Sequence, residues 1–212
     1  MEVKLISYSQ PDEYELYTAQ DLVAYCARVS NPENQMNTET SERLIKYLIK
    51  HKHWSPFEMV NACLEIKTTR DIARQILRHR SFSFQEFSQR YAKATNFEIR
   101  EARLQDKQNR QNSIETHNER LQDEWELIQE EIINKAKISY NWALNQGIAK
   151  EQARAILPEG ITQSTLYMNG TLRSWIHYIE LRTGPETQKE HRLVAEECKK
   201  VLATIFPVIN EL

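Results

Sequence analysis

Apolar and polar residues alternate most regularly in residues 59–67, which is typical of a strand with one buried face. Every second position there is apolar: Val60, Ala62, Leu64 and Ile66. A short strand is predicted at 3–5, where the same alternation begins the chain, and another at 161–168. These segments are expected to form the central sheet.

A spacing of three or four residues between apolar positions predicts helices elsewhere, because it places those side chains on one side of a helix. Thr18 is expected to cap the first helix, with its apolar residues turned inward: Leu22, Val23 and Cys26. A second helix is predicted from about Thr40 to Lys52. Helix resumes at about Arg70, with Arg74 and Arg78 on the same stripe, and we expect ordinary surface charge at the first two arginines.

The longest helix is predicted from about 113 to 146 and is closed by Gly147. Its apolar stripe consists of Leu121, Trp125, Ile128, Ile132 and Ala136. Residues 92–112 are charged and aperiodic, so a surface loop is predicted there. A short helix around 153–156 and two final helices separated by Gly184-Pro185 complete the prediction.

Together these patterns predict an α/β (α+β) fold. We expect one domain over residues 1–212, with a mixed central sheet, surrounding helices and a helical insertion at about 113–146.

The composition of the chain disfavours several classes of function. A formal net charge of −2 disfavours bulk electrostatic binding of DNA or RNA. No run reaches the roughly 18 apolar residues of a membrane helix, and the N-terminal residues lack a signal-peptide pattern. The three cysteines are widely spaced, which suggests neither a disulfide framework nor a zinc site. We therefore expect a cytoplasmic protein, of a cell or of a virus-infected host, with no nucleic-acid or membrane partner.

The densest concentration of chemistry lies in residues 78–91, Arg-His-Arg-Ser-Phe-Ser-Phe-Gln-Glu-Phe-Ser-Gln-Arg-Tyr. Guanidinium groups bind phosphate and carboxylate through paired hydrogen bonds, and serine hydroxyls add neutral donors. A solvated basic face is the alternative, but it does not explain the serines and phenylalanines between the charges. The segment predicts a nucleotide site.

The pattern R-H-R-x-x-S-x-x-E-x-S-x-R-Y in this segment resembles the signature of the flavin-dependent thymidylate synthases. That family methylates dUMP with FAD, methylenetetrahydrofolate and NADPH. Gln85 stands where the family has asparagine. The resemblance implies two overlapping sets of site residues. For dUMP they are Gln75, Arg78, Glu86, Ser88, Gln89 and Arg90; for the flavin they are Arg78, His79, Arg80 and Glu86.

A second segment, 53–58, reads His-Trp-Ser-Pro-Phe-Glu. Ser55 and Glu58 have the spacing of a capping box, with Pro56 at the first helical position, and this structural role alone could account for them. The family has a similar segment, which implies that the hydroxyl of Ser55 meets the flavin. His51 and His53 lack a third ligand nearby, so no metal is predicted.

A third segment, 169–182, reads as an amphipathic helix with charged residues on its other faces. It resembles a family pattern that implies flavin contacts at Thr171, Arg173 and His177. The family asparagine is replaced at Thr171 or displaced to Asn169.

The same resemblance implies that Arg182 lies beside the uracil as the catalytic candidate, because a cation there stabilises an electron-rich ring. Residues 153–158 match a further family motif, whose arginine, here Arg154, reaches dUMP. The unrelated classical thymidylate synthases use a cysteine nucleophile, whereas Cys26, Cys63 and Cys198 read here as buried or idle thiols.

The family forms homotetramers with shared active sites, and we expect the same here. Two other classes remain open at this point. One is a noncatalytic nucleotide- or flavin-binding homologue, suggested by Gln85 and Thr171; the other is an RNA-binding module, disfavoured by the net charge.

Overall fold

The computed structural model describes residues 1–12 and 16–211. Its main sheet has the order β1-β2-β6-β3, formed by β1 (Glu2–Tyr8), β2 (Asn61–Thr69), β6 (Gln163–Thr171) and β3 (Ser83–Glu86). All of its pairings are antiparallel, so the expectation of a mixed sheet is wrong. The sheet is antiparallel because each strand starts at the end of the sheet where its hydrogen-bonded neighbour stopped. Ala62, near the start of β2, for example pairs with Tyr8 at the end of β1.

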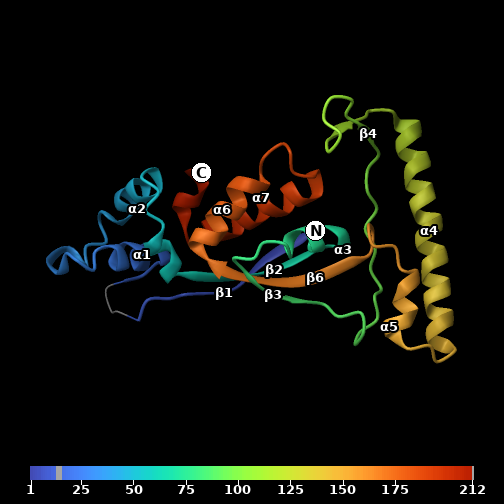
Figure 1. Ribbon diagram of the computed structural model, residues 1–212, viewed down its shortest axis with the longest axis horizontal. Helices are drawn as coiled ribbons and strands as arrows, with labels where there is room; N and C mark the ends of the chain where they lie inside the picture. Colours follow the sequence, from blue (N-terminus) through green and yellow to red (C-terminus); the bar gives the residue numbers. More distant parts are fainter. Residues whose placement is uncertain (13–15, 212) are drawn as a thin grey trace.

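One face of the sheet carries the core (Figure 1). Helices α6 (Leu172–Arg182) and α7 (Lys189–Ala203) lie side by side over it. The alternation predicted for β2 is confirmed, because Ala62, Leu64 and Ile66 are fully buried. Trp175 of α6 is also fully buried, and its indole Nε1 donates to the Ala62 carbonyl at 3.0 Å. The opposite face is more exposed, as Tyr167 shows at 40%.

The N-terminal helices α1 (Ala19–Ala27) and α2 (Ser41–Lys50) pack at one end of this core, with 3-10 turns η1 (Pro32–Asn34) and η4 (Pro207–Glu211). Thr18 caps α1 as predicted. Its Oγ1 accepts from the backbone N–H of Asp21, and the Asp21 carboxylate accepts from the backbone N–H of Thr18 in return. This capping box satisfies two amides that the helix itself leaves unpaired.

Helix α3 (Arg70–Ile76) ends earlier than predicted. Arg78 lies beyond it, so the expected three-arginine stripe is not formed. Strand β3, which was not predicted, follows within the 78–91 segment, where Phe82 belongs to the core and Phe84 packs against it. Phe82 packs against Gly170, where a Cβ atom would lie 2.4 Å from the ring. A glycine is therefore required for this close approach of β6 to the segment.

Residues 88–160 form a separate projection, which we call the arm; the remaining described residues are the body (Figure 1). The arm contains a two-stranded ribbon, β4 (Arg103–Gln105) with β5 (Ser113–Glu115), then α4 (Glu119–Asn145), α5 (Lys150–Ala153) and η3 (Arg154–Ile156). The predicted loop 92–112 thus includes a strand, and the long helix begins six residues later than the predicted 113. Gly147 ends it with φ +80°, as expected of a helix-terminating glycine.

Of the predicted apolar stripe of α4, only Ala136 is buried, whereas Trp125, Ile128 and Ile132 are 40–49% exposed. Glutamines lie on the inner face of the first half of the helix: the amides of Gln122 and Gln129 each accept from and donate to the backbone of one residue in the extended segment 100–102. Apolar residues follow on the inner face of the second half. The sequence pattern failed here because the neighbour of α4 is an unpaired backbone, which requires polar partners.

Candidate active site

Two arginines stand in the turn after α3 without a partner. Arg78 and Arg80 are exposed, and within residues 1–12 and 16–211 neither side chain makes an ion pair or hydrogen bond. Because a guanidinium stays charged at all relevant pH values, this turn offers two uncommitted cations. Such a pair suits a phosphate or pyrophosphate group.

Arg182 lies at the end of α6 and meets the same turn from the other side. Its Nε donates to Nε2 of His79 at 2.9 Å, so the imidazole must accept there and carry its proton on Nδ1. Burial and the charge of Arg182 lower the pKa of His79 to about 4. The contact therefore holds a neutral histidine beside a cation that has no carboxylate partner among the described residues.

Gln75 is directed inward from the last turn of α3. Its Oε1 lies 3.2 Å from Nδ1 of His191, and its Nε2 donates to Oε1 of Gln188 at 2.8 Å. Nε2 of His191 lies in turn 3.1 Å from the hydroxyl of Tyr178, which stands edge-on to His79 at 4.9 Å between ring centroids. Gln75, His79 and Arg182 thus belong to one polar cluster between α3, α6 and α7.

Glu86 ends β3 with one carboxylate oxygen engaged. Its Oε1 accepts from the hydroxyl of Ser164 at 2.8 Å and lies 3.5 Å from Nη1 of Arg70. Arg70 is only 9% exposed, so the expectation of ordinary surface charge is wrong for it. Arg74, by contrast, is exposed and pairs with Glu159. The second oxygen of Glu86 has no hydrogen-bond partner among the described residues and can accept from a ligand.

Beyond β3 the chain turns into the arm and carries Ser88, Gln89 and Arg90 with it. Gln89 is 4% exposed, and its Nε2 has no hydrogen-bond partner, which is costly unless an acceptor reaches it. Arg90 pairs with the Glu151 carboxylate at 3.3 Å, and Nε of Arg154 donates to the Glu151 carbonyl at 3.3 Å. Two arginines predicted to bind one ligand therefore lie beside the same residue.

A third group surrounds the 3-10 turn η2 (Ser55–Met59). Ser55 begins this turn and caps nothing, so the predicted capping box is wrong; Glu58 pairs instead with Arg173 of α6. His177 stands edge-on to Trp54, with ring centroids 4.7 Å apart. The residues with implied flavin contacts at 55, 173 and 177 are thus brought together.

Thr171 has a structural task in the same group. Its hydroxyl caps α6 by accepting from the backbone N–H of Ser174 at 3.2 Å. Asn169 is exposed on β6, in register with Ser83. A flavin contact at Thr171, in place of the family asparagine, stays a prediction.

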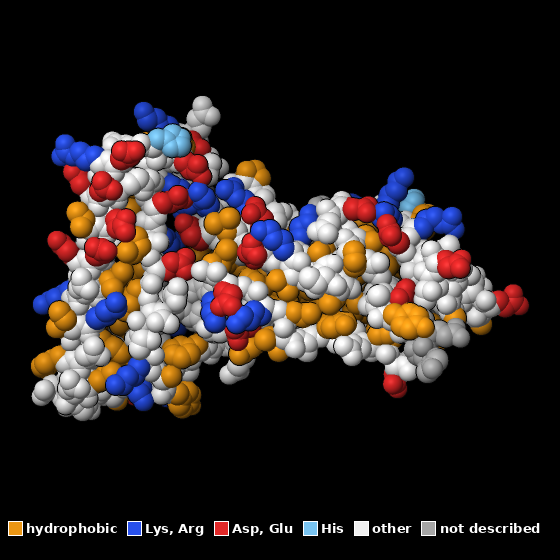
Figure 2. All heavy atoms as spheres, turned by 180° about the vertical axis from the view of Figure 1, so that it is seen from behind, with side chains coloured by type: hydrophobic (Ala, Val, Ile, Leu, Met, Phe, Trp, Pro, Cys, Tyr) orange, Lys and Arg blue, Asp and Glu red, His pale blue; other side chains and the backbone are white. Residues whose placement is uncertain are grey.

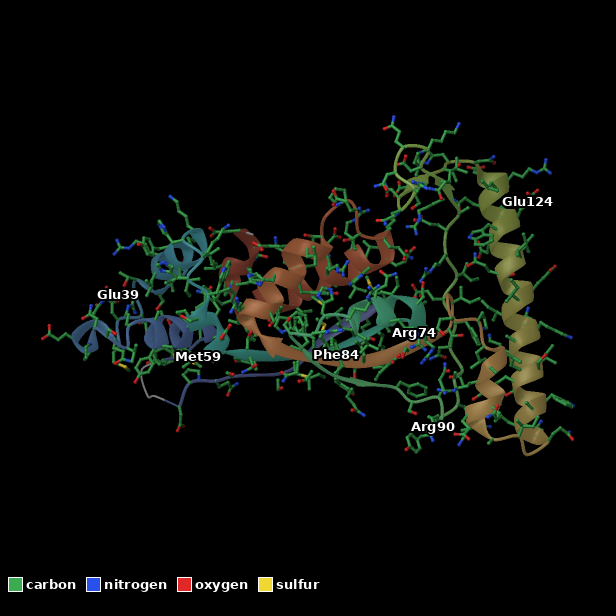
Figure 3. The ribbon with its side chains drawn as sticks, viewed as in Figure 1. Glu39, Met59, Arg74, Phe84, Arg90 and Glu124 are labelled. Carbon is green, nitrogen blue, oxygen red and sulfur yellow. The ribbon has the colours of Figure 1, made fainter. Side chains whose placement is uncertain are left out.

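The arm group lies apart from the other two in a single chain. Figure 3 shows Arg90 near α5, at the far side of β6 from α6 and α7. The residues that the resemblance assigns to one nucleotide are therefore divided between the body and the arm.

Comparison with known proteins identifies the family of this arrangement. Residues 5–208 match the family model described as thymidylate synthase complementing protein. The chain is 53% identical over 210 residues to a probable flavin-dependent thymidylate synthase of Paramecium bursaria Chlorella virus 1, covering 99% of this chain and 97% of the relative. The chain belongs to the flavin-dependent thymidylate synthase family.

Other relatives agree. The flavin-dependent thymidylate synthase of Synechocystis sp. is 48% identical over 212 residues, covering 99% of this chain and 97% of the relative. Among solved structures, a UMP/dUMP methylase, PolB from Streptomyces cacaoi bound with 5-Br dUMP, superposes with a TM-score of 0.83 at 27% identity and covers 99% of this chain and 93% of its own. The resemblance found in the sequence is confirmed.

Sequence reasoning missed Tyr178, Gln188 and His191. A signal for the last was present, because His191 heads the buried stripe of α7 that continues with Val194, Ala195, Cys198 and Leu202. A histidine in such a stripe needs polar partners within the core. Tyr178 and Gln75 supply them.

The thiols fit a flavin-dependent rather than a cysteine-dependent thymidylate synthase. Burial raises the pKa of Cys26, Cys63 and Cys198, which disfavours the nucleophilic thiolate. Within the part of the chain that the structure describes, no group of three or more His, Cys, Asp or Glu could hold a metal ion. In that part no helix is long and apolar enough to span a bilayer.

Proposed function

We propose that this protein methylates dUMP to dTMP, with methylenetetrahydrofolate as carbon donor and NADPH as reductant through FAD. The observation that carries the proposal is Arg182, a cation held by neutral His79 and balanced by no described carboxylate. Methylation at C5 requires electron density in the uracil ring. A fixed guanidinium facing O2 and N3 stabilises that density as it develops.

For FAD we propose the turn after α3 and the η2 group. The unpaired Arg78 and Arg80 match the charge of a pyrophosphate, and the Ser55 hydroxyl is exposed without a capping role. His79, Glu86, Thr171, Arg173 and His177 complete the proposed set. The flavin would supply hydride transfer, while these residues orient it and balance its charge.

For dUMP we propose Gln75, Arg78, Glu86, Ser88, Gln89, Arg90, Arg154 and Arg182. Arg90 and Arg154 would bind the phosphate, which would replace Glu151 as the partner of Arg90. The buried Nε2 of Gln89, which has no acceptor, would gain one from the nucleotide. Ser88 would help to hold the substrate without acting as a nucleophile, since its hydroxyl meets no histidine among the described residues.

The division of this set between body and arm supports a homotetramer with shared sites, in which the arm of one chain completes the body site of another. The arm offers a surface for such contacts. Between α4 and α5 lies an apolar groove of about 480 Å³, lined by residues that include Ile138, Trp142, Ile148 and Ile156. Figure 2 shows hydrophobic side chains at this end of the molecule, on the left, between charged ones. Sedimentation that finds a flavin-loaded, active monomer would contradict this arrangement.

We also propose that residues 1–212 form one catalytic domain and that the reaction takes place in the cytoplasm.

The decisive experiment is a visible absorption spectrum of the purified protein, followed by titration with dUMP and by a turnover assay with methylenetetrahydrofolate and NADPH. We expect a flavin spectrum that dUMP perturbs and that bleaches on reduction. A flavin spectrum and dUMP binding without turnover would favour the noncatalytic homologue instead.

A further inference from the structure

A continuous chain of side-chain hydrogen bonds runs behind Gln75. It links the Tyr178 hydroxyl, His191, Gln75, Gln188 and the Glu190 carboxylate, with contacts of 3.1, 3.2, 2.8 and 2.9 Å in that order. The chain connects α6, α7 and α3, and His191 at its centre is fully buried.

The direction of this chain is fixed from its charged end. The Glu190 carboxylate can only accept, and it is held by Arg103 at 2.6 Å. Gln188 must therefore donate its N–H to Glu190 and accept at Oε1 from Gln75. That leaves Oε1 of Gln75 to accept from His191, so His191 carries its proton on Nδ1 and accepts from Tyr178 at Nε2.

This ordering leaves Gln75 with one uncommitted N–H. If the Gln75 amide were reversed, its oxygen would face the oxygen of Gln188, and His191 would have to take its other tautomer to accept from the Gln75 NH₂ group. The contact between the two oxygens would be repulsive. The amide therefore has a single favourable orientation, and its free donor is available to a ligand.

We propose that His191 is a positioning residue for dUMP, acting by fixing the Gln75 amide so that its free N–H faces the nucleotide. The inference rests on the proposed function, which places dUMP against Gln75. A connected network holds its groups more rigidly than isolated bonds do, so this donor would be preorganised before substrate binds.

The surroundings of His191 keep it neutral, as the role requires. The titratable and charged groups facing it are Tyr178 and Arg182 from α6 and His79 from the turn after α3, the last at 6.4 Å between ring centroids. Burial, Arg182 and His79 lower the pKa of His191 to about 3. The imidazole is thus neutral at neutral pH, and its hydrogen-bond partners select the tautomer.

The test is titration of the flavin-loaded protein with dUMP, comparing His191→Phe with His191→Gln. Phenylalanine keeps the ring but removes both hydrogen bonds, and we expect roughly tenfold weaker dUMP binding. Glutamine can still donate to Gln75 and accept from Tyr178, so it should recover most of the loss. Val194→Ala is the matched control: it removes buried volume one turn further along α7, and should lower the melting temperature without changing dUMP affinity.

A double-mutant cycle separates positioning from general loosening. In a Gln75→Ala background, His191→Phe should change dUMP affinity less than twofold, because its target is gone. Two results would overturn this inference and leave the proposed function standing. One is a folded His191→Phe protein that binds dUMP as tightly as wild type, and the other is a double variant in which the two losses of affinity add. If His191→Phe does not fold, a His191→Gln protein that binds as weakly as Gln75→Ala overturns it. Wild-type protein that binds no dUMP would overturn the proposed function as well, and so distinguishes the two failures.

Discussion

The body and the arm use apolar residues in opposite ways. In the body, Trp175 is fully buried and belongs to one continuous core that covers the inner face of the sheet. In the arm, Trp142 and Ile138 are 60% and 67% exposed, and the local cluster of buried residues contains only Tyr140, Ala143 and Ala153. None of the residues of the main core belongs to the arm.

Backbone hydrogen bonds and charge join the two regions: Phe97 of the arm forms an isolated β-bridge with Thr162 of the body. Arg100 of the arm pairs with Asp71 of the body at 2.8 Å, and Arg103 pairs with Glu190 at 2.6 Å. Polar junctions of this kind fix orientation but contribute little net stability. The comparison shows that an apolar helical pattern predicts a buried face without saying which chain buries it. The arm has such a pattern, and the described part of this chain leaves its Trp142 and Ile138 exposed.

The largest expected effect is a difference in unfolding free energy between alanine variants of Trp175 in the body and Trp142 in the arm. Trp175→Ala should destabilise the protein by about 3–5 kcal/mol, because it leaves a cavity in the core and removes the hydrogen bond that the indole donates to the Ala62 carbonyl. Trp142→Ala should change the stability of the single chain by less than about 0.5 kcal/mol. It should instead weaken assembly. Denaturant unfolding and sedimentation measure the two effects, and equal unfolding losses would remove the distinction between body and arm.

The body was largely predictable from the sequence. Alternation gave β2, the helical period gave α1, α2, α6 and α7, and Thr18 marked a cap, because in each case the partner surface is the chain's own core. The family signature placed Arg182 and His79 in one site, and the structure brings them into contact.

The arm and the finer site geometry were less predictable because they depend on distant neighbours. The inner face of α4 carries Gln122 and Gln129 because the segment 100–102 runs along the first half of the helix. Ser55 does not cap its turn, since Trp54 holds the N-cap position, and Glu58 pairs with Arg173, which is 115 residues further along the chain. The chain of bonds through His191 likewise requires α3, α6 and α7 to converge.

A second prediction uses the histidines that the body buries. The pKa of His79 is lowered to about 4 and that of His191 to about 3, whereas an unfolded histidine titrates near 6.5. Between about pH 6.5 and 4 the unfolded chain therefore binds more protons, so stability falls as the pH falls through this window. We expect a loss on the order of 3 kcal/mol between pH 8 and pH 5, allowing for solvent screening at half-buried His79.

Denaturant midpoints measured across this range test the assignment. The loss should shrink in His191→Phe, which has one buried titrating group fewer. His117→Gln is the control in the arm, where the side chain is exposed and its removal should leave the pH slope unchanged. An unchanged slope in His191→Phe would refute the contribution of the body histidines.

A third prediction concerns the arginines of the arm. Arg90→Ala and Arg154→Ala should each weaken dUMP binding by about 1.5–3 kcal/mol, the range for hydrogen bonds to a charged group. Deoxyuridine, which lacks the phosphate, should be far less sensitive to either change. Titration of both compounds decides the matter, since equal losses would place these arginines away from the phosphate.

The corresponding body arginine should act on chemistry rather than on affinity. Arg182→Lys keeps the charge but loses the planar fork, so turnover at saturating substrate should fall roughly tenfold while dUMP affinity changes less. Flavin content should stay near that of wild type, whereas His177→Ala should release flavin. Unchanged saturated turnover in Arg182→Lys would remove this residue from the catalytic set.

The smallest expected effect compares two helix caps. Thr18 caps α1 in the body, and Asn118 caps α4 in the arm by accepting from the backbone N–H of Leu121 at 3.2 Å. Replacing either with alanine should cost about 1 kcal/mol locally. Because α1 is part of the main core, Thr18→Ala should lower the global unfolding midpoint. Asn118→Ala should instead increase amide exchange in the first turns of α4 alone, since the arm contributes no residue to that core. Hydrogen exchange measured residue by residue resolves the two cases, and a global loss of protection in Asn118→Ala would mean that the body and the arm unfold as one cooperative unit.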